Sequence, residues 1–159
     1  MALAPFPETT APDSIRTLRM SERVEQLVQL PLFSQCSKRH LRALARLTRQ
    51  QQLEAGATLI TEGGDSDEAY VILAGLAVVR RKGRKIAELR TGDVAGELGL
   101  LLERPRMATV SARTPLECLV IRRSDLRACI AEAPELGWLL LSTVALRLSN
   151  ATPSAPGQA

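Results

Sequence analysis

Aromatic residues, histidine and cysteine are all scarce in this sequence. Its 159 residues include one tryptophan, one tyrosine, two phenylalanines and a single histidine, His40. One histidine cannot easily supply the ligands of a catalytic metal centre, and His40 follows Lys38 and Arg39 near the start of an apparent helix, where a surface position is expected. We also find no paired base and nucleophile and no carboxylate dyad. The sequence therefore predicts neither an enzyme nor a metal or cofactor site.

The three cysteines do not form a disulfide pattern. Cys36, Cys118 and Cys129 are odd in number, show no CxxC spacing and lie in or beside apolar runs. Such residues are typical of reduced, packed thiols, which favours the cytoplasm. The N-terminus has neither the order of a signal peptide nor a run long enough to cross a bilayer, so we expect no membrane partner. Frequent alanine, leucine and arginine indicate a GC-rich bacterial source.

Positive charge is in modest excess and is densest in one short run. The net charge is +4, and "RRKGRK" fills residues 80–85. The run lies between two strand-like segments with Gly83 near its middle, which is typical of a solvated hairpin tip. No aromatic residue is interleaved with these charges to stack on bases. We therefore do not expect nucleic acid as a partner.

The organisation predicts one domain between two flexible ends. Residues 1–20 are rich in Pro, Thr and Ala without periodicity, and the tail 150–159 is similar. The domain proper is expected at 21–149. Its first helix begins near Ser21 and ends before Pro31.

A second helix is expected from Ser37, and the sequence pattern then becomes typical of β-strands. From residue 51 to residue 122, short runs rich in Val, Leu and Ile are separated by Gly, Asp and Pro about every ten residues, as in an antiparallel sandwich or barrel. The predicted strands span residues 58–61, 69–73, 76–80, 86–89, 108–113 and 116–121.

Two more helices are expected after the strands, one opened by Ser124 and Asp125 and one by Pro134. Residues 136–148 are apolar almost all round, which exceeds the single stripe that a surface helix buries. We expect Trp138 in the core. A ligand, a second copy of the chain or a neighbouring domain would cover the remaining apolar face.

The stretch "GELGLLLERPRMATV", residues 96–110, interrupts the strands with a short helix-like run. The first amides of such a turn favour anions, and Gly96 and Gly99 let a ligand approach the backbone. The planar guanidinium of Arg106 suits phosphate oxygens, while Glu97 accepts hydrogen bonds only. A phosphate with a neighbouring ribose hydroxyl fits both residues. Alternatively, Glu97 merely favours the start of a helix and Arg106 is solvated.

This stretch also resembles the phosphate-binding cassette of the cyclic nucleotide-binding domain family, which includes the cAMP receptor protein and protein kinase A regulatory subunits. The resemblance extends over about residues 24–148. "PLFSQCSKRHLRALA" and "LEAGATLITEGGDSDEAYVILAGLAVV" precede the cassette in the family order. It implies a mainly β fold: an eight-stranded jelly roll (double-stranded β-helix) with N-terminal helices, a short cassette helix and two C-terminal helices.

The resemblance further implies a ligand site. Glu97 would bind the ribose 2′-hydroxyl and Arg106 the phosphate, with the amides of Gly99 and Met107 completing the phosphate site. Leu89 and Val71 are candidate walls, and Gly63, Asp67 and Gly75 match structural positions. The last helix would close over the base. The implied ligand-binding residues are Gly96, Glu97, Leu98, Gly99, Arg106, Met107 and Ala108, and the lid candidates are Leu139, Leu140 and Thr143.

Two positions depart from the family pattern. Ala95 stands where the family usually has Phe, and Met107 stands where a small or hydroxyl residue is common. A Thr or Ser after the arginine favours cGMP in the family, so Met107 favours cAMP or weak binding, with cGMP left open.

The resemblance implies a regulatory domain in which ligand shifts the last helix and changes a surface seen by an effector. No winged-helix segment follows Leu148, so we do not expect DNA binding. The protein partner would be an unknown effector or a second copy bound through the last helix. The alternative is a degenerate domain that serves protein interaction or dimerisation without useful nucleotide affinity.

Overall fold

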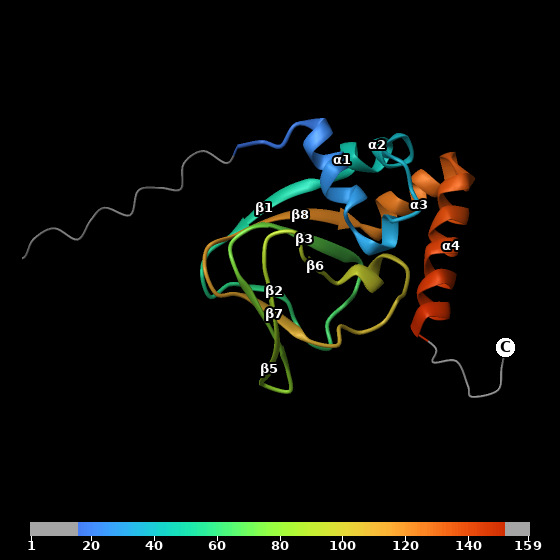
Figure 1. Cartoon of the computed structure of the whole chain (residues 1–159). Coiled ribbons are helices and arrows are strands. Elements are labelled where there is room, and N and C mark those ends of the chain that lie inside the picture. Colours follow the sequence, from blue (N-terminus) through green and yellow to red (C-terminus); the bar gives the residue numbers. More distant parts are fainter. Residues whose placement is uncertain (1–15, 152–159) are drawn as a thin grey trace, which may run out of the picture.

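The structure is a computed structural model that describes residues 16–151. Four helices, two short 3-10 helices and eight strands follow one another in the order helices, strands, helices (Figure 1). The helical elements are α1 (Met20–Val28), η1 (Pro31–Phe33), α2 (Lys38–Leu47), η2 (Glu97–Leu100), α3 (Arg123–Glu132) and α4 (Pro134–Ala151). The strands are β1 (Arg49–Leu53), β2 (Thr58–Ile60), β3 (Glu68–Ala74), β4 (Ala77–Arg81), β5 (Arg84–Leu89), β6 (Val94–Ala95), β7 (Thr109–Ala112) and β8 (Leu116–Arg122).

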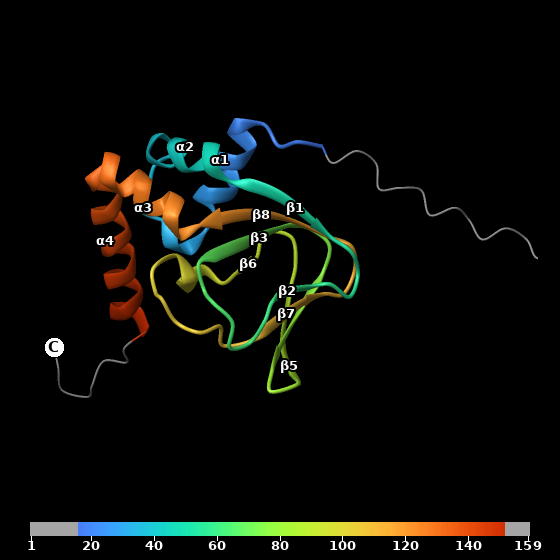
Figure 2. The same ribbon diagram turned by 180° about the vertical axis from the view of Figure 1, so that it is seen from behind.

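The strands form two antiparallel four-stranded sheets. One has the order β1-β8-β3-β6 and the other β2-β7-β4-β5. Neighbours in each sheet are mostly far apart in the sequence, as in a jelly roll. The predicted fold class is therefore confirmed. The helices gather beside the first sheet, and the β4–β5 hairpin extends away from them, as both Figure 1 and the reverse view in Figure 2 show.

Alternation along β3 divides the interior into two clusters. Val71 packs among residues of the helices, including Leu27, Phe33 and Leu126. Its neighbours Tyr70 and Ile72 point the other way, and they pack between the two sheets. The same strand therefore serves both layers.

Glycine sets two of the turns by adopting positive φ. Gly75 joins β3 to β4 at φ +96°, and a Cβ added there would overlap the carbonyl oxygen of Pro115. At the β4–β5 hairpin, Lys82 and Gly83 have φ values of 50° and 76°. Two consecutive positive φ values match the right-handed twist of the flanking strands. "RRKGRK" is thus a hairpin tip, as expected.

The prediction from sequence missed two strands, and several predicted strand boundaries differ from those in the structure. β1, with the sequence RQQQL, carries no hydrophobic alternation, and β6 has only two residues. The predicted strands otherwise match within one or two residues. Ser37 is the N-cap residue of α2, as expected, and α4 begins at Pro134. α4 extends through Asn150 to Ala151, both of which we had assigned to the tail, and α1 begins at Met20, which we had assigned to the N-terminal arm. Residues 1–15 and 152–159 of the two predicted ends lie outside the described residues.

Helix α4 buries one face only. Leu136, Leu140 and Thr143 are buried, and α4 lies against η1 and α3. The expectation of a core position for Trp138 is wrong, because 69% of its surface is exposed, and Leu141 is also exposed. The apolar excess predicted for this helix therefore lies on its outer side.

Within residues 16–151, no single helix is both long enough and apolar enough to cross a membrane. Helices α3 and α4 meet the length and composition requirement only as a pair that is bent by 120°.

Candidate functional site

The cassette begins with a backbone turn that requires glycine. Gly96 adopts φ 75° and ψ 23° directly before η2, in the left-handed region. A Cβ added at Gly96 would overlap the guanidinium of Arg106, and one added at Gly99 would overlap the hydroxyl of Ser66. The two glycines therefore allow the cassette backbone to lie against Arg106, which comes from the segment before β7.

Arg106 is held by backbone carbonyls. Its Nε donates to the carbonyl oxygen of Asp65 at 3.1 Å, and its Nη2 donates to that of Glu68 at 2.6 Å. Within residues 16–151 no carboxylate forms an ion pair with Arg106. The half-buried guanidinium is thus fixed in place by neutral groups and keeps an uncompensated positive charge. Such a group favours an anion at its remaining donors.

Glu97 faces the helices in this structure. Its side chain is only 12% exposed, and Oε1 accepts hydrogen bonds from the backbone amide of Leu32 at 2.6 Å and from Nη1 of Arg147 at 3.3 Å. Leu32 belongs to η1 and Arg147 to α4. Glu97 therefore connects the cassette with both helical parts of the chain, a role that sequence reasoning missed. Its contact with a ribose stays a prediction.

The two amides expected at the phosphate site differ. Gly99 N donates to the carbonyl oxygen of Gly96 at 2.9 Å, so it is engaged within η2. Met107 N has no backbone acceptor among residues 16–151. Met107 and Ala108 both line the cavity described below. Of the two amides, that of Met107 is therefore the one already open to a ligand.

Arg123, at the start of α3, is a further residue that the sequence analysis missed. Its Nη1 donates to the carbonyl oxygens of Ser66 at 2.8 Å, Leu102 at 3.2 Å and Gly99 at 3.3 Å, and its side chain is 15% exposed. It joins the end of the cassette to the loop before β3. The signal that would have found it is an arginine at a strand-to-helix junction, which is too common to single out.

A cavity of about 300 Å³ opens beside the cassette. Its polar side chains, Ser66, Glu97, Arg104 and Arg106, come from the cassette and the loop before β3. The rest of the wall is largely apolar and comes from both sheets and the cassette. It includes Ile60, Val79, Leu89, Val94, Ala95, Leu98, Leu102, Met107 and Val110. The cavity can hold a ligand with one anionic part and one flat, less polar part.

The structure brings together most of the predicted site. Gly96, Glu97, Leu98, Gly99, Arg106, Met107, Ala108 and the wall residue Leu89 all line the cavity. Val71 does not, because its side chain packs on the helical side of β3, so that expectation is wrong.

The three lid candidates, Leu139, Leu140 and Thr143, pack against the core from α4, and no α4 residue lines the cavity. Their role as a lid stays a prediction.

Ala95 lies beside a tyrosine at the position where the family pattern has an aromatic residue. It pairs with Tyr70 across β3 and β6, and both side chains are buried in the cluster between the sheets. Tyr70 Oη donates to Glu68 at 2.7 Å. Burial raises the pKa of Tyr70, and the Glu68 carboxylate raises it further. An uncharged tyrosine therefore supplies the aromatic ring beside the cassette.

The composition of this site agrees with sequence comparison. The family model described as "Cyclic nucleotide-binding domain" matches residues 50–133, which include the whole cassette. The chain belongs to the cyclic nucleotide-binding domain family. Within the residues that the structure describes, this cyclic nucleotide-binding domain has no group of three His, Cys, Asp or Glu side chains placed to hold a metal ion.

Two relatives of this cyclic nucleotide-binding domain are protein kinase components. It is 38% identical over 93 residues to a cAMP-dependent protein kinase regulatory subunit of Yarrowia lipolytica, covering 57% of this chain and 25% of that one. It is 26% identical over 136 residues to a cGMP-dependent protein kinase of Eimeria tenella, covering 86% and 14%. The chain thus spans a quarter or less of these relatives.

Among solved structures, the N-terminal domain of a transcriptional regulator from Streptomyces coelicolor is similar with a TM-score of 0.73 and 30% identity. The match covers 82% of this chain and 99% of that one.

Proposed function

We propose that the chain is a regulatory domain that binds cAMP in the cavity beside the cassette. The observation that carries the proposal is the Arg106 guanidinium, which is fixed by two carbonyls, lacks a described acidic partner and lines an apolar cavity. The cyclic phosphate would bind Arg106 and the amide of Met107. The ribose 2′-hydroxyl would donate to Glu97, and the base would contact the apolar wall.

The choice of cAMP over cGMP rests on Met107. Its side chain is exposed, lines the cavity directly after Arg106, and offers no hydroxyl to a guanine edge or a phosphate. The cavity wall offers few polar side chains to a base. The kinase regulatory subunit with 38% identity is named for cAMP, and the kinase named for cGMP is 26% identical.

The proposed response is a shift of α4. Binding at Glu97 competes with or reorients its contact with Arg147, and so favours one position of the helix over another. A ligand can shift this equilibrium only by its differential affinity for the two positions. Trp138, the only tryptophan, lies on the exposed face of α4 and reports the shift directly.

Isothermal titration calorimetry tests the site with cAMP, cGMP and 5′-AMP. We expect cAMP to bind more tightly than cGMP, and we expect no binding of 5′-AMP. Arg106→Ala removes charge-assisted hydrogen bonds to the phosphate and should weaken cAMP binding by about 1.5–3 kcal/mol. The control Arg104→Ala removes the same charge from the cavity lining and should have a smaller effect. Equal affinity of Arg106→Ala and the parent would refute the phosphate site.

Tryptophan fluorescence tests the response of the helix. cAMP should change the quenching of Trp138 by acrylamide in the parent protein, with a midpoint equal to the calorimetric Kd. Saturating cAMP without any change in Trp138 quenching would leave a binding site without helix movement and refute this part of the proposal.

A second candidate function is protein interaction without nucleotide. The exposed part of α4 carries Trp138, Leu141 and Leu146, and several exposed apolar side chains on one element often mark an interface. Analytical ultracentrifugation distinguishes the two. If no nucleotide binds in the calorimetric titrations and the chain forms a dimer that Leu141→Glu dissociates, this function is favoured over the sensor.

A further inference from the structure

A second hollow lies on the outer face of the sheet β2-β7-β4-β5. It has a volume of about 490 Å³, and Val78, Arg80, Lys85, Ser111 and Arg113 line it. The nucleotide cavity contains Val79 and shares no residue with it. Because successive residues of a strand point to opposite faces, the two hollows lie on opposite sides of β4.

The outer hollow is strongly cationic. Glu88 forms ion pairs with Lys85, with Arg113 at 3.0 Å and with Arg90 at 3.4 Å. The hydrogen bond from Lys85 holds the pKa of Glu88 below its usual value, so this carboxylate stays charged. Arg80 has no ion-pair partner within residues 16–151. Three cations thus share one carboxylate, and Arg80 adds a further positive charge to the lining of the hollow.

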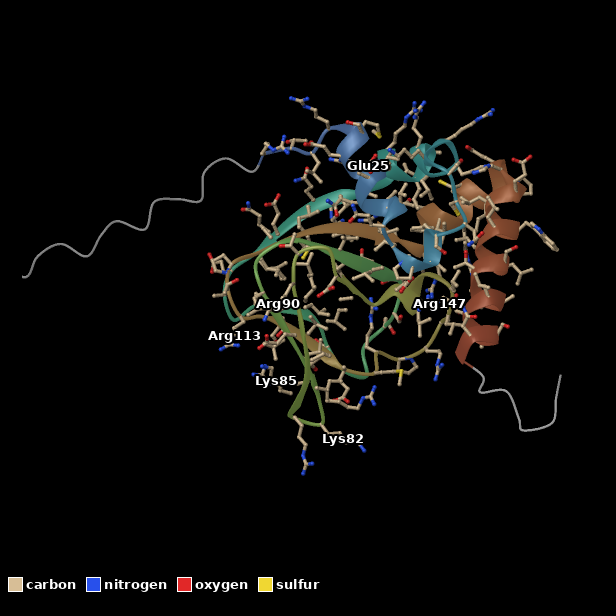
Figure 3. All side chains as sticks on the ribbon, viewed as in Figure 1. Glu25, Lys82, Lys85, Arg90, Arg113 and Arg147 are labelled. Carbon is tan, nitrogen blue, oxygen red and sulfur yellow. The ribbon has the colours of Figure 1, made fainter. Side chains whose placement is uncertain are left out.

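The charge continues onto the hairpin. Lys82 and Arg84 lie at the tip, where Glu62 accepts a hydrogen bond from the backbone amide of Lys82 at 3.2 Å. Figure 3 shows Lys82, Lys85, Arg90 and Arg113 along the side of the molecule formed by the hairpin, away from Arg147 on α4. We call the surface formed by Arg80, Lys82, Lys85, Arg90 and Arg113 the basic face.

Strand β5 forms one edge of the basic face. It is the last strand of its sheet, and β4 is its only strand neighbour among residues 16–151. Residues 84–87 are exposed. One side of β5 therefore presents main-chain N–H and C=O groups that an added strand can pair with.

Charged residues on an edge strand also serve to prevent aggregation. That role accounts for Arg84 and Lys85, which lie on β5. It does not account for Arg80 on the interior strand β4 or for Arg113 after β7, both of which line the hollow. The positively charged side chains therefore extend across the sheet, as expected for a surface that binds an anionic partner.

Three classes of anionic partner are possible, and the surface favours one. Single-stranded nucleic acid uses aromatic side chains for stacking, and the hollow contains none. A membrane-binding hairpin inserts apolar residues, and Ile86 is the only exposed large one on β5. A concave cationic surface beside an open strand edge instead matches an extended acidic peptide.

We propose that the basic face binds an extended acidic segment of a partner protein. The segment adds a strand beside β5 and places carboxylates against Arg80, Lys85 and Arg113. This proposal is independent of nucleotide binding, because the two hollows share no residue. Charge complementarity gives the affinity its salt dependence, and main-chain pairing fixes the direction of the segment.

Fluorescence anisotropy of a fluorescein-labelled peptide with alternating Glu and Val tests the proposal on the full chain. The double variant Arg80→Glu/Arg113→Glu should weaken binding at least tenfold. The control Arg39→Glu/Arg42→Glu makes the same change in net charge on exposed positions of α2 and should change binding less than twofold. A neutralised pair, Arg80→Gln/Arg113→Gln, should give an intermediate loss and guards against misfolding of the reversed variant.

A second probe separates charge from strand pairing. The same peptide with alternate backbone amides methylated keeps every carboxylate but cannot pair along one edge, so it should bind at least fivefold more weakly. Equal affinity of the methylated peptide, or of the charge-reversed variant, would overturn the proposal. So would tighter binding of single-stranded DNA or of phosphatidylserine vesicles than of the acidic peptide.

Discussion

Gly96→Ala tests how the cassette positions its arginine. Gly96 has φ 75°, and an alanine there costs about 1–2 kcal/mol of stability through left-handed backbone strain. Its Cβ would also overlap the Arg106 guanidinium. Arg106 must then give up at least one of its hydrogen bonds to Asp65 and Glu68, at about 1.5–3 kcal/mol for a bond to a charged group. The expected total is about 2.5–5 kcal/mol.

The matched control is Gly83→Ala at the hairpin tip. Gly83 has φ 76°, nearly the same as Gly96, and an added Cβ would have no atom within 4 Å. It therefore incurs the backbone strain alone. The smaller conformational entropy of alanine in the unfolded chain is common to both variants and cancels in the comparison.

Urea denaturation and calorimetry with cAMP provide the two measurements. Gly96→Ala should be about 1.5–3 kcal/mol less stable than Gly83→Ala, and it should lose at least about tenfold in cAMP affinity, or roughly 1.4 kcal/mol. Gly83→Ala should bind cAMP like the parent. If the two variants are equally stable and both bind normally, the position of Arg106 does not depend on Gly96 and the reasoning is wrong.

Two further predictions concern the core beside the site. Arg123→Ala removes contacts to three carbonyls and should lower the free energy of unfolding by about 1.5–3 kcal/mol. The control Arg127→Ala changes an exposed residue on the same helix and should lower the free energy of unfolding by less than about 1 kcal/mol. Urea denaturation measures both variants. Burial raises the pKa of Cys118 to about 12, so above pH 9 the unfolded chain loses a proton that the native thiol retains. Stability should therefore fall as pH rises from 9 to 11, less steeply in Cys118→Ala; equal slopes would contradict the assignment.

The elements that sequence predicted best are those whose signals are local. Glycines such as Gly75 and Gly83 marked turns because the backbone there needs positive φ, and Pro134 marked the start of α4. Strand β1 was missed because its sequence, RQQQL, is polar. It is a strand because it pairs with β8 along its whole length, which is information held elsewhere in the chain.

Side-chain direction was the part of the site that sequence did not predict. Tyr70 and Val71 are adjacent apolar residues, and only the packing of helices on one face of β3 decides which of them points between the sheets. The apolar pattern of α4 similarly gave no basis for placing Trp138 on the exposed side. The cassette was predicted more fully because its glycines, Glu97 and Arg106 lie within one short segment.

The Glu97 carboxylate contacts two parts of the chain that are remote in sequence. Leu32 lies 65 residues before it and Arg147 lies 50 residues after it. An event at this one side chain therefore acts at the same time on the helical segment before the strands and on the helix after them. If ligand binding changes these contacts as proposed, a pair of fluorophores attached on η1 and α4 would report it as a change in energy transfer, and the domain would serve as a ratiometric indicator of its ligand.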